Sequence, residues 1–258
     1  MTQKAPALFL GHGSPMNAIE DTPSSRGWRE IAARFPKPRA IICVSAHWIT
    51  EGVRVTANAR PRTIHDFGGF PPELFAVEYP APGDPRLAGD IAKRLVAFDA
   101  EGDERWGLDH GTWSVLVHMY PDADVPVLQV SLDARRAPAE HYSIGKALAP
   151  LRDEHVAIIG SGDIVHNLRA FFGRGGGDGA GDREFDDFIV SAAESGDHDA
   201  VINYRAHPNA AHAAPDWDHF VPLLYVLAAQ GEGESAHVFN RELFPGLSMT
   251  SVGFGVSA

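Results

Sequence analysis

The chain has 258 residues, of which 44% are hydrophobic and 22% are charged, so it can build one sizeable core and is too apolar to be intrinsically disordered. Its 34 acidic against 22 basic side chains give a formal net charge of −12, which disfavours binding to nucleic acids and to anionic membranes. The single cysteine, Cys43, excludes a disulfide framework. No apolar run is long enough for a membrane span and no secretory signal is recognisable, so we expect a cytoplasmic protein.

Short aliphatic runs alternate with amphipathic stretches, a pattern that is typical of an α/β fold. The aliphatic runs predict strands at Ala7–Leu10, Ala40–Ser45, Gly52–Ala57, Val125–Ser131, Val156–Gly160 and Leu247–Phe254. The amphipathic stretches predict helices at Ser25–Phe35, Pro85–Ala97, Thr112–Tyr120, Pro138–Leu151, Arg183–Glu194 and Phe220–Ala229. Near-continuous apolar runs such as AIICVS and VAIIGSG indicate strands covered on both faces, hence a mostly parallel or mixed central sheet flanked by helices.

Two segments interrupt this alternation. Residues 60–84 are rich in proline, glycine and aromatic side chains and lack helical or strand periodicity, which predicts a structured loop over a site. Residues 173–182 (GRGGGDGAGD) predict a flexible surface loop. The sequence contains neither an internal repeat nor an interdomain linker, so we expect residues 1–258 to form a single domain.

Three apolar runs end in small residues followed by histidine: ALFLGHG with His12, IICVSAHW with His47 and VAIIGSGDIVHN with His166. Ligands collect beyond the carboxyl ends of strands in open α/β sheets, and histidine is a common metal ligand and a general acid or base near neutral pH. One histidine after a strand is typical of a structural, hydrogen-bonded residue. Three in the same context favour a shared metal or proton-transfer site.

Three further histidines are candidates for the same site. His110 lies in GLDHGTW just before an apolar helix, as a functional loop residue would. His219 begins another helix in PDWDHF, where it either points into the strand-end crevice or is satisfied by Asp216 or Asp218. His65, in TIHDFGGF, either touches a substrate or caps a turn. We expect His118 to be buried inside a helix. We expect the other six to lie at the surface: His141, His155, His198, His207, His212 and His237.

Much of the chain consists of short motifs in a fixed order: GHGSPMN (11–17), SAHW (45–48), TIHDFGGFPPELF (63–75), YPAPG (79–83), LDHGTW (108–113), YPDADVPV (120–127), SGDIVHNL (161–168) and HFVPLLYVL (219–227). Together they resemble the class III, LigB-type extradiol ring-cleavage dioxygenases, most closely the DOPA 4,5-dioxygenase branch. The similarity runs from about residue 5 to the C-terminus and is poorest near 173–182 and 231–246.

The resemblance implies a non-haem metal, with Fe(II) expected for catalysis and Zn(II) as another occupant. It implies that His12, His47 and His219 bind this metal. It also implies that His166 is a base beside the metal or a further ligand, and that His110 transfers a proton. Many members of the wider family use two histidines and one carboxylate, whereas His219 occupies the third position here. Ligand type alone therefore does not name the metal.

The same resemblance implies metal-dependent insertion of O2 into a catechol, DOPA or a related one, to give a muconic semialdehyde. The expected binding partners of the protein are then a small aromatic diol and O2. We expect it to bind neither nucleic acid nor membranes, and it is a possible homo-oligomer. His65 and the aromatic side chains of residues 60–84 are expected to contact the substrate, unless these rings only bury the loop. Two alternatives stay open: a zinc-dependent hydrolase on the same scaffold, and a metal-binding or ligand-sensing module without the reaction.

Overall fold

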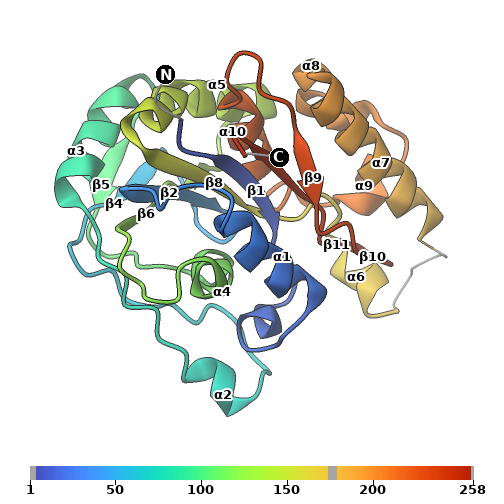
Figure 1. Cartoon of the computed structure of the whole chain (residues 1–258). Helices are drawn as coiled ribbons and strands as arrows, with labels where there is room; N and C mark the ends of the chain where they lie inside the picture. Colours follow the sequence, from blue (N-terminus) through green and yellow to red (C-terminus); the bar gives the residue numbers. More distant parts are fainter. Residues whose placement is uncertain (1–3, 174–178, 257–258) are drawn as a thin grey trace.

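The computed structural model describes residues 4–173 and 179–256, and in them a central sheet lies between two layers of helices (Figure 1). Six strands form this sheet: β1 Ala7–Gly11, β2 Ala40–Ser45, β6 Val127–Gln129, β8 Val156–Gly162, β9 His237–Phe239 and β12 Ser251–Phe254. Their order is β6-β2-β8-β1-β12-β9. The first four in this order run parallel, and β12 pairs antiparallel with β1 and β9. The predicted α/β fold with a mixed, mostly parallel sheet is confirmed.

Both faces of the sheet are buried, because successive strand residues point to opposite sides. In β1, Ala7 and Phe9 pack into one hydrophobic core, while Leu8 and Leu10 pack into a second. The first core is covered by α3 (Pro85–Arg94), α5 (Pro138–Leu148), α7 (Ala180–Ser195) and α10 (Pro222–Ala228). The second is covered by α1 (Pro23–Ala32) and α4 (His110–Met119). This double burial accounts for the continuous apolar runs of the parallel strands.

Shorter elements connect these layers. Four of them are α-helical: α2 (Pro72–Phe75), α6 (Leu168–Phe171), α8 (His198–Ile202) and α9 (Ala210–Ala213). Four are 3₁₀-helical: Pro15–Ala18, Val96–Phe98, Ala149–Glu154 and Tyr204–Ala206. The remaining strands pair in twos: β3 (Ile49–Thr50) with β7 (Leu132–Asp133), β4 (Arg54–Thr56) with β5 (Glu101–Asp103), and β10 (Leu243–Phe244) with β11 (Leu247–Ser248).

Two predicted strands differ from the observed ones. The stretch Leu247–Phe254 is divided at Met249, whose backbone crosses so near Gly11 that a Cβ there would lie 2.6 Å from the Met249 carbonyl carbon. The predicted strand Gly52–Ala57 shortens to β4 and stays outside the central sheet. Beside it there is only an isolated bridge between Val55 and Val130, and the backbone amide of Gln129 donates to the side-chain Oγ1 of Thr56 at 2.8 Å.

The two segments predicted to be irregular, 60–84 and 173–182, differ in how far the structure matches the prediction. Residues 60–84 contain only the single turn of α2 and are otherwise irregular, as predicted. They are nonetheless anchored, since Ile64 donates to the Leu108 carbonyl and Tyr79 is buried. Of the predicted loop 173–182, residues 174–178 lie outside the described residues, and 180–182 already belong to α7.

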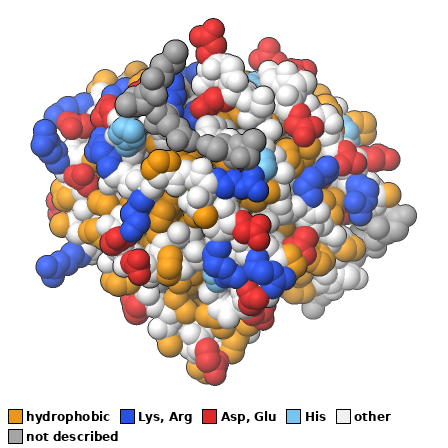
Figure 2. Space-filling model, in the orientation of Figure 1, with side chains coloured by type: hydrophobic (Ala, Val, Ile, Leu, Met, Phe, Trp, Pro, Cys, Tyr) orange, Lys and Arg blue, Asp and Glu red, His pale blue; other side chains and the backbone are white. Residues whose placement is uncertain are grey.

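The surface mixes both signs of charge. On the face seen in Figure 2, basic and acidic side chains are interspersed, with hydrophobic side chains between them. No helix within residues 4–173 and 179–256 combines the length and the apolarity that crossing a membrane requires.

Candidate metal centre

The parallel strands β1, β8 and β2 are neighbours, so their carboxyl ends meet at one edge of the sheet. Gly11 is in register with Gly162, and Ser45 with Ser161. His12 follows β1 directly and His47 lies two residues after β2. The segment that carries His219 reaches the same edge by passing close to Gly162 at the end of β8. Any side chain at position 162 would collide with it, because a Cβ there would lie 2.1 Å from the His219 carbonyl oxygen.

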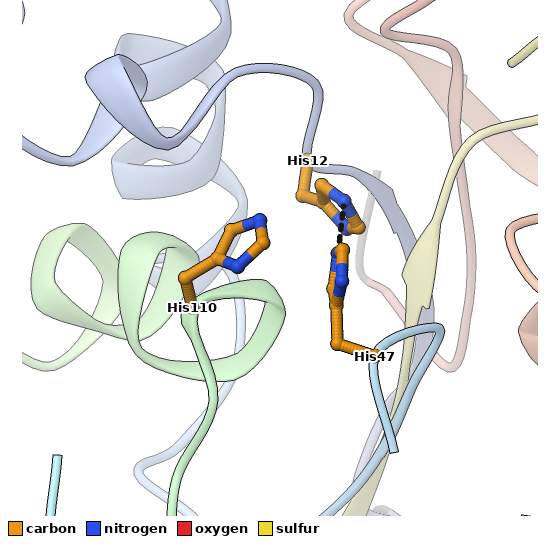
Figure 3. A group of neighbouring side chains, drawn as sticks. All are labelled: His12, His47 and His110. Carbon is orange, nitrogen blue, oxygen red and sulfur yellow. Dashed lines mark hydrogen bonds between the residues drawn. The ribbon is translucent and has the colours of Figure 1, made fainter. Parts of the chain in front are cut away.

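Four imidazole rings converge at this edge. The Nε2 atoms of His12 and His47 face each other at 3.2 Å, and the His110 ring lies beside them (Figure 3). The His219 ring centroid lies 5.3 Å from that of His12 and 5.0 Å from that of His47. The His110 centroid lies 4.0 Å from that of His47. The structure thus brings together the three residues that the resemblance assigns to the metal, with His110 adjacent.

His110 is positioned by the start of α4. Asp109 caps this helix and accepts hydrogen bonds from Ser45 Oγ at 2.7 Å and from Gln129 Nε2 at 2.6 Å, which ties α4 to the ends of β2 and β6. Asp66 receives the His110 backbone amide at 2.9 Å and lies 3.0 Å from its Nδ1. Burial alone would raise the pKa of Asp66, but the contact with His110 outweighs it and the pKa is lowered. Asp66 is therefore an ionised partner for the His110 ring.

Hydrogen bonding sets the tautomer of His12. Its Nδ1 lies 3.0 Å from Ser161 Oγ, and that hydroxyl donates its only proton to the Gly111 carbonyl. His12 Nδ1 must therefore donate, which leaves Nε2 with a free lone pair in the neutral ring. Burial, reinforced by neighbouring histidines, lowers the pKa of His12 well below its ordinary value and keeps the ring neutral.

His47 has the same arrangement. Its Nδ1 lies 3.5 Å from the carboxylate of Asp66, which favours a proton on that nitrogen. Burial, and then His110, lower its pKa as well. When both rings carry their proton on Nδ1, the tautomer that ligation through Nε2 requires, the two Nε2 lone pairs face each other at 3.2 Å. A cation beside these atoms would resolve the repulsion, so the donor set fits a divalent metal.

The structure adds a carboxylate that the sequence analysis did not include. Asp163 follows β8 as His12 follows β1, and it is fully buried. Its Oδ1 accepts from the Gly13 amide at 3.0 Å, whereas its Oδ2 has no hydrogen-bond partner and lies 3.7 Å from His12 Nε2. Burial raises its pKa. The position of Asp163 directly after an apolar run is the sequence feature that could have identified it as a site residue. In the described residues, two overlapping donor groups could hold a metal: His12, His47 and His110, or His12, Asp163 and His219.

His166 lies beside these groups without belonging to either. Its ring stacks on that of His219, with centroids 3.5 Å apart and planes 3° apart. Burial, followed by the proximity of His219, lowers the pKa of His166 to about 3. The ring lines a cavity of about 440 Å³. His219 itself lies 3.2 Å through Nδ1 from Asp218 Oδ1, so it is both paired with an aspartate and part of the cluster.

His65 is not brought to the cluster. Its Nε2 lies 2.9 Å from the Val77 carbonyl oxygen, and its ring packs against Phe67, Phe75 and Trp113. Besides Asp66, Phe67 of the loop contacts His110, at 5.5 Å between ring centroids. Aromatic rings of this segment therefore form one wall next to the histidines.

The other histidines lie outside the cluster, although His212 lines the cavity beside His166. His118, expected to be buried, is half-buried in α4 and bonds to the Asn17 carbonyl. The surface expectation for His141 is wrong: the ring is fully buried, since α5 turns this residue toward Tyr225 and Trp217. Of the remaining five, His155 and His212 are exposed. The other three are partly buried: His198, His207 and His237.

The chain is similar to known proteins over nearly its whole length. The family described as the catalytic LigB subunit of aromatic ring-opening dioxygenase matches residues 6–255. The chain is 42% identical over 260 residues to a 4,5-DOPA dioxygenase extradiol of Escherichia coli (strain K12), over 98% of this chain and 95% of that protein. It is 38% identical over 243 residues to a 4,5-DOPA dioxygenase extradiol of Beta vulgaris, over 91% and 90% of the two chains. A crystal structure of an uncharacterized Escherichia coli K12 protein has a TM-score of 0.83 and 37% identity, over 97% of this chain and 99% of that chain.

These matches cover nearly the whole chain and confirm the resemblance seen in the motifs. They support the expected dioxygenase, with an aromatic substrate, O2 and a catalytic metal, and lend no support to the hydrolase. The chain belongs to the LigB family of aromatic ring-opening dioxygenases and is an extradiol ring-cleavage enzyme.

Proposed function

We propose that this dioxygenase opens the ring of a DOPA-like catechol at a metal ion held by His12, His47 and His219. The facing lone pairs of His12 and His47 carry the proposal, because a bound cation satisfies both. Relatives named 4,5-DOPA dioxygenase extradiol support the choice of substrate. All three residues belong to the single domain that we assign to the chain.

Fe(II) is the metal that we assign to catalysis, with Zn(II) as a second occupant of the same nitrogens. Bound iron would supply the redox chemistry with O2 and would make the catechol hydroxyls more acidic. The protein supplies neutral imidazoles, since burial and mutual repulsion disfavour protonation of His12 and His47. Asp163, with one unpartnered oxygen 3.7 Å from His12, is a further group facing the ion.

We assign His166 as the base that takes a proton from a catechol hydroxyl. Its ring lies on His219, lines the neighbouring cavity and forms no hydrogen bond with another described side chain, so its nitrogens are free for the substrate. A positioned base of this kind contributes about 10²–10⁴-fold to rate. Metal content of a His166→Ala protein separates this role from that of a further ligand.

We assign His110 as the acid that returns a proton during ring opening. Asp66 lies 3.0 Å from Nδ1 and holds the orientation of the ring, which leaves Nε2 to donate to the substrate. Phe67 packs on this ring and limits the access of water from the side of the loop.

Oxygen uptake tests the proposal directly. Protein loaded anaerobically with Fe(II) is mixed with L-DOPA, caffeate, protocatechuate or catechol in an oxygen electrode, and products are followed by absorbance. Consumption of one O2 per catechol with formation of a semialdehyde supports the proposal. Zinc-loaded protein that hydrolyses esters or amides without oxygen uptake would favour the hydrolase. Tight catechol binding to iron-loaded protein without any oxygen uptake would favour a sensing module.

A further inference from the structure

The cavity of about 440 Å³ beside the histidine cluster lies on the His166 side and is lined also by Asn167, Arg169, His212 and Asp216. This volume is in the range of small-molecule sites. The His166 ring, which stacks on His219, is the lining residue that connects this cavity to the histidine cluster. A catechol whose hydroxyls meet His166 would therefore extend its ring substituent toward the outer part of this cavity.

The walls of the cavity are held in place by hydrogen bonds. Asn167 donates through Nδ2 to the His212 carbonyl at 2.8 Å, and its own amide donates to the Gly246 carbonyl at 2.7 Å. The amide of His166 donates to the Ala213 carbonyl at 2.8 Å. These bonds join α6 to the segment before α10, so the two sides keep a fixed relation.

Opposite charges on these two sides have no partners in the described chain. Arg169 lies on α6, Asp216 lies in the segment that leads to His219, and both are exposed. Neither forms an ion pair or a side-chain hydrogen bond with a described residue, although most of the other arginines and lysines do. An arginine and an aspartate that line the same cavity suit a ligand that carries one carboxylate and one ammonium group.

A second cavity, of about 430 Å³, lies on the His47 side and lacks this pairing. It offers Arg62 and Arg105, and its only carboxylate is Asp103. That carboxylate already accepts the backbone amides of Arg105 at 2.7 Å and Trp106 at 2.8 Å. The cavity therefore has no free anion for an ammonium group.

We propose that the cavity beside His166 binds the α-amino-acid group of the substrate, with its carboxylate on Arg169 and its ammonium on Asp216. The preferred substrates are then catechols with a zwitterionic side chain rather than neutral or purely acidic catechols. This inference rests on the proposed function, since it places the substituent of the ring that the metal site opens.

Four catechols and two variants test it. L-DOPA carries both charges, dopamine only the ammonium, dihydroxyphenylpropionate only the carboxylate, and methylcatechol neither. Arg169→Gln should raise KM about 10- to 100-fold for L-DOPA and dihydroxyphenylpropionate and leave dopamine and methylcatechol unchanged. Asp216→Asn should raise KM for L-DOPA and dopamine only. kcat should change little, and the anaerobic dissociation constant of each catechol for zinc-loaded protein should follow KM.

Arg62→Gln is the matched control, because it removes an unpaired arginine from the other cavity. It should leave all four KM values unchanged. If Arg62→Gln instead raises KM for the two carboxylates, or if Arg169→Gln affects all four catechols alike, the inference is overturned while the ring-opening function stands. If the unaltered enzyme cleaves none of the four, it is the proposed function that fails. Arg169→Lys should recover part of the affinity, which a merely structural role would not predict.

Discussion

Both ends of the sheet bury charged or titratable groups, but these groups have hydrogen-bond partners at one end and lack some of them at the other. At the end where β1 and β8 begin, Arg152 is 1% exposed and fully partnered. It donates to the carbonyls of Ala5 and Ala229 and to both carboxylate oxygens of Glu234. At the end where these strands finish, His12 and His47 direct lone pairs at each other.

This contrast separates structural from functional burial. A buried polar group without a partner costs about 1–3 kcal/mol, so folding alone favours the arrangement around Arg152. The carboxyl end retains unsatisfied atoms, among them Asp163 Oδ2, and the metal ion that we propose there would complete them. Stability is expected to depend on the first end and activity on the second.

The largest expected effect is at the metal ligands. His12→Ala should abolish metal binding and lower ring cleavage more than about 10⁴-fold, since the ion loses the nitrogen shared by both donor groups. The metal-free protein should unfold at the same urea concentration as the metal-free parent, or at a higher one, because a buried imidazole is removed. Metal analysis and urea denaturation measure both. A variant that retains full metal and activity contradicts the assignment.

His166→Ala should lower kcat about 10²–10⁴-fold with most of the metal retained. The reason is loss of the base beside His219, whereas the donor groups remain complete. Metal content and steady-state kinetics on the same preparation decide the point. His155→Ala, which removes an exposed histidine at the amino end of β8, opposite the carboxyl ends of the strands, is the control and should change neither quantity. Loss of all metal would make His166 a ligand instead.

Arg152→Met tests the other end of the sheet. The substitution leaves the carbonyls of Ala5 and Ala229 without their donor and Glu234 without its ion pair. We expect a loss of about 3–5 kcal/mol in the free energy of unfolding, the usual result of breaking a buried pair, with kcat unchanged in the folded enzyme. Urea denaturation measures the loss. A stable but inactive variant would mean that the two ends are not independent.

His141 predicts a pH dependence of stability that is unrelated to the metal. Burial against Tyr225 and Trp217 lowers its pKa to about 4, from an ordinary value of 6.5. The unfolded chain therefore binds a proton more readily, and stability should fall as the pH decreases from about 6.5 to about 4. His141→Gln should reduce this pH-dependent loss by up to about 3 kcal/mol. Denaturation of metal-loaded parent and variant at pH 7 and pH 4.5 gives the difference, and equal losses would refute the prediction.

The smallest effect is expected in the irregular segment. His65→Ala removes the contact with the Val77 carbonyl and loosens the packing of Phe67 against His110. KM for a substituted catechol should rise a few-fold, with unchanged metal content. Phe67→Ala should have the larger effect, because its ring touches the cluster directly. A larger change for His65→Ala than for Phe67→Ala would show that His65 contacts the substrate itself.

The outline of the fold and part of the site were readable from local patterns. Continuous burial of Ala7–Gly11 and Ala40–Ser45 on both faces accounts for the apolar runs that predicted a doubly covered sheet. The histidines that follow these runs were recognisable as candidate site residues, because the carboxyl ends of parallel strands lie at one edge of the sheet. The boundary at His110 was missed by two residues, since the capping by Asp109 depends on Ser45 and Gln129 from other strands.

The sequence by itself determined the α/β class, the apolar strands and the motifs that align with the LigB family, because burial periodicity and motif order are properties of neighbouring residues. Only the tertiary structure decided that Asp163 and Asp66 face the histidines, that Phe67 and not His65 lies against them, and that His141 is buried. The division of Leu247–Phe254 also came from packing, at the crossing of Met249 over Gly11. Such contacts depend on the order of strands in the sheet and on residues tens to hundreds of positions apart, so no local pattern of the chain predicts them.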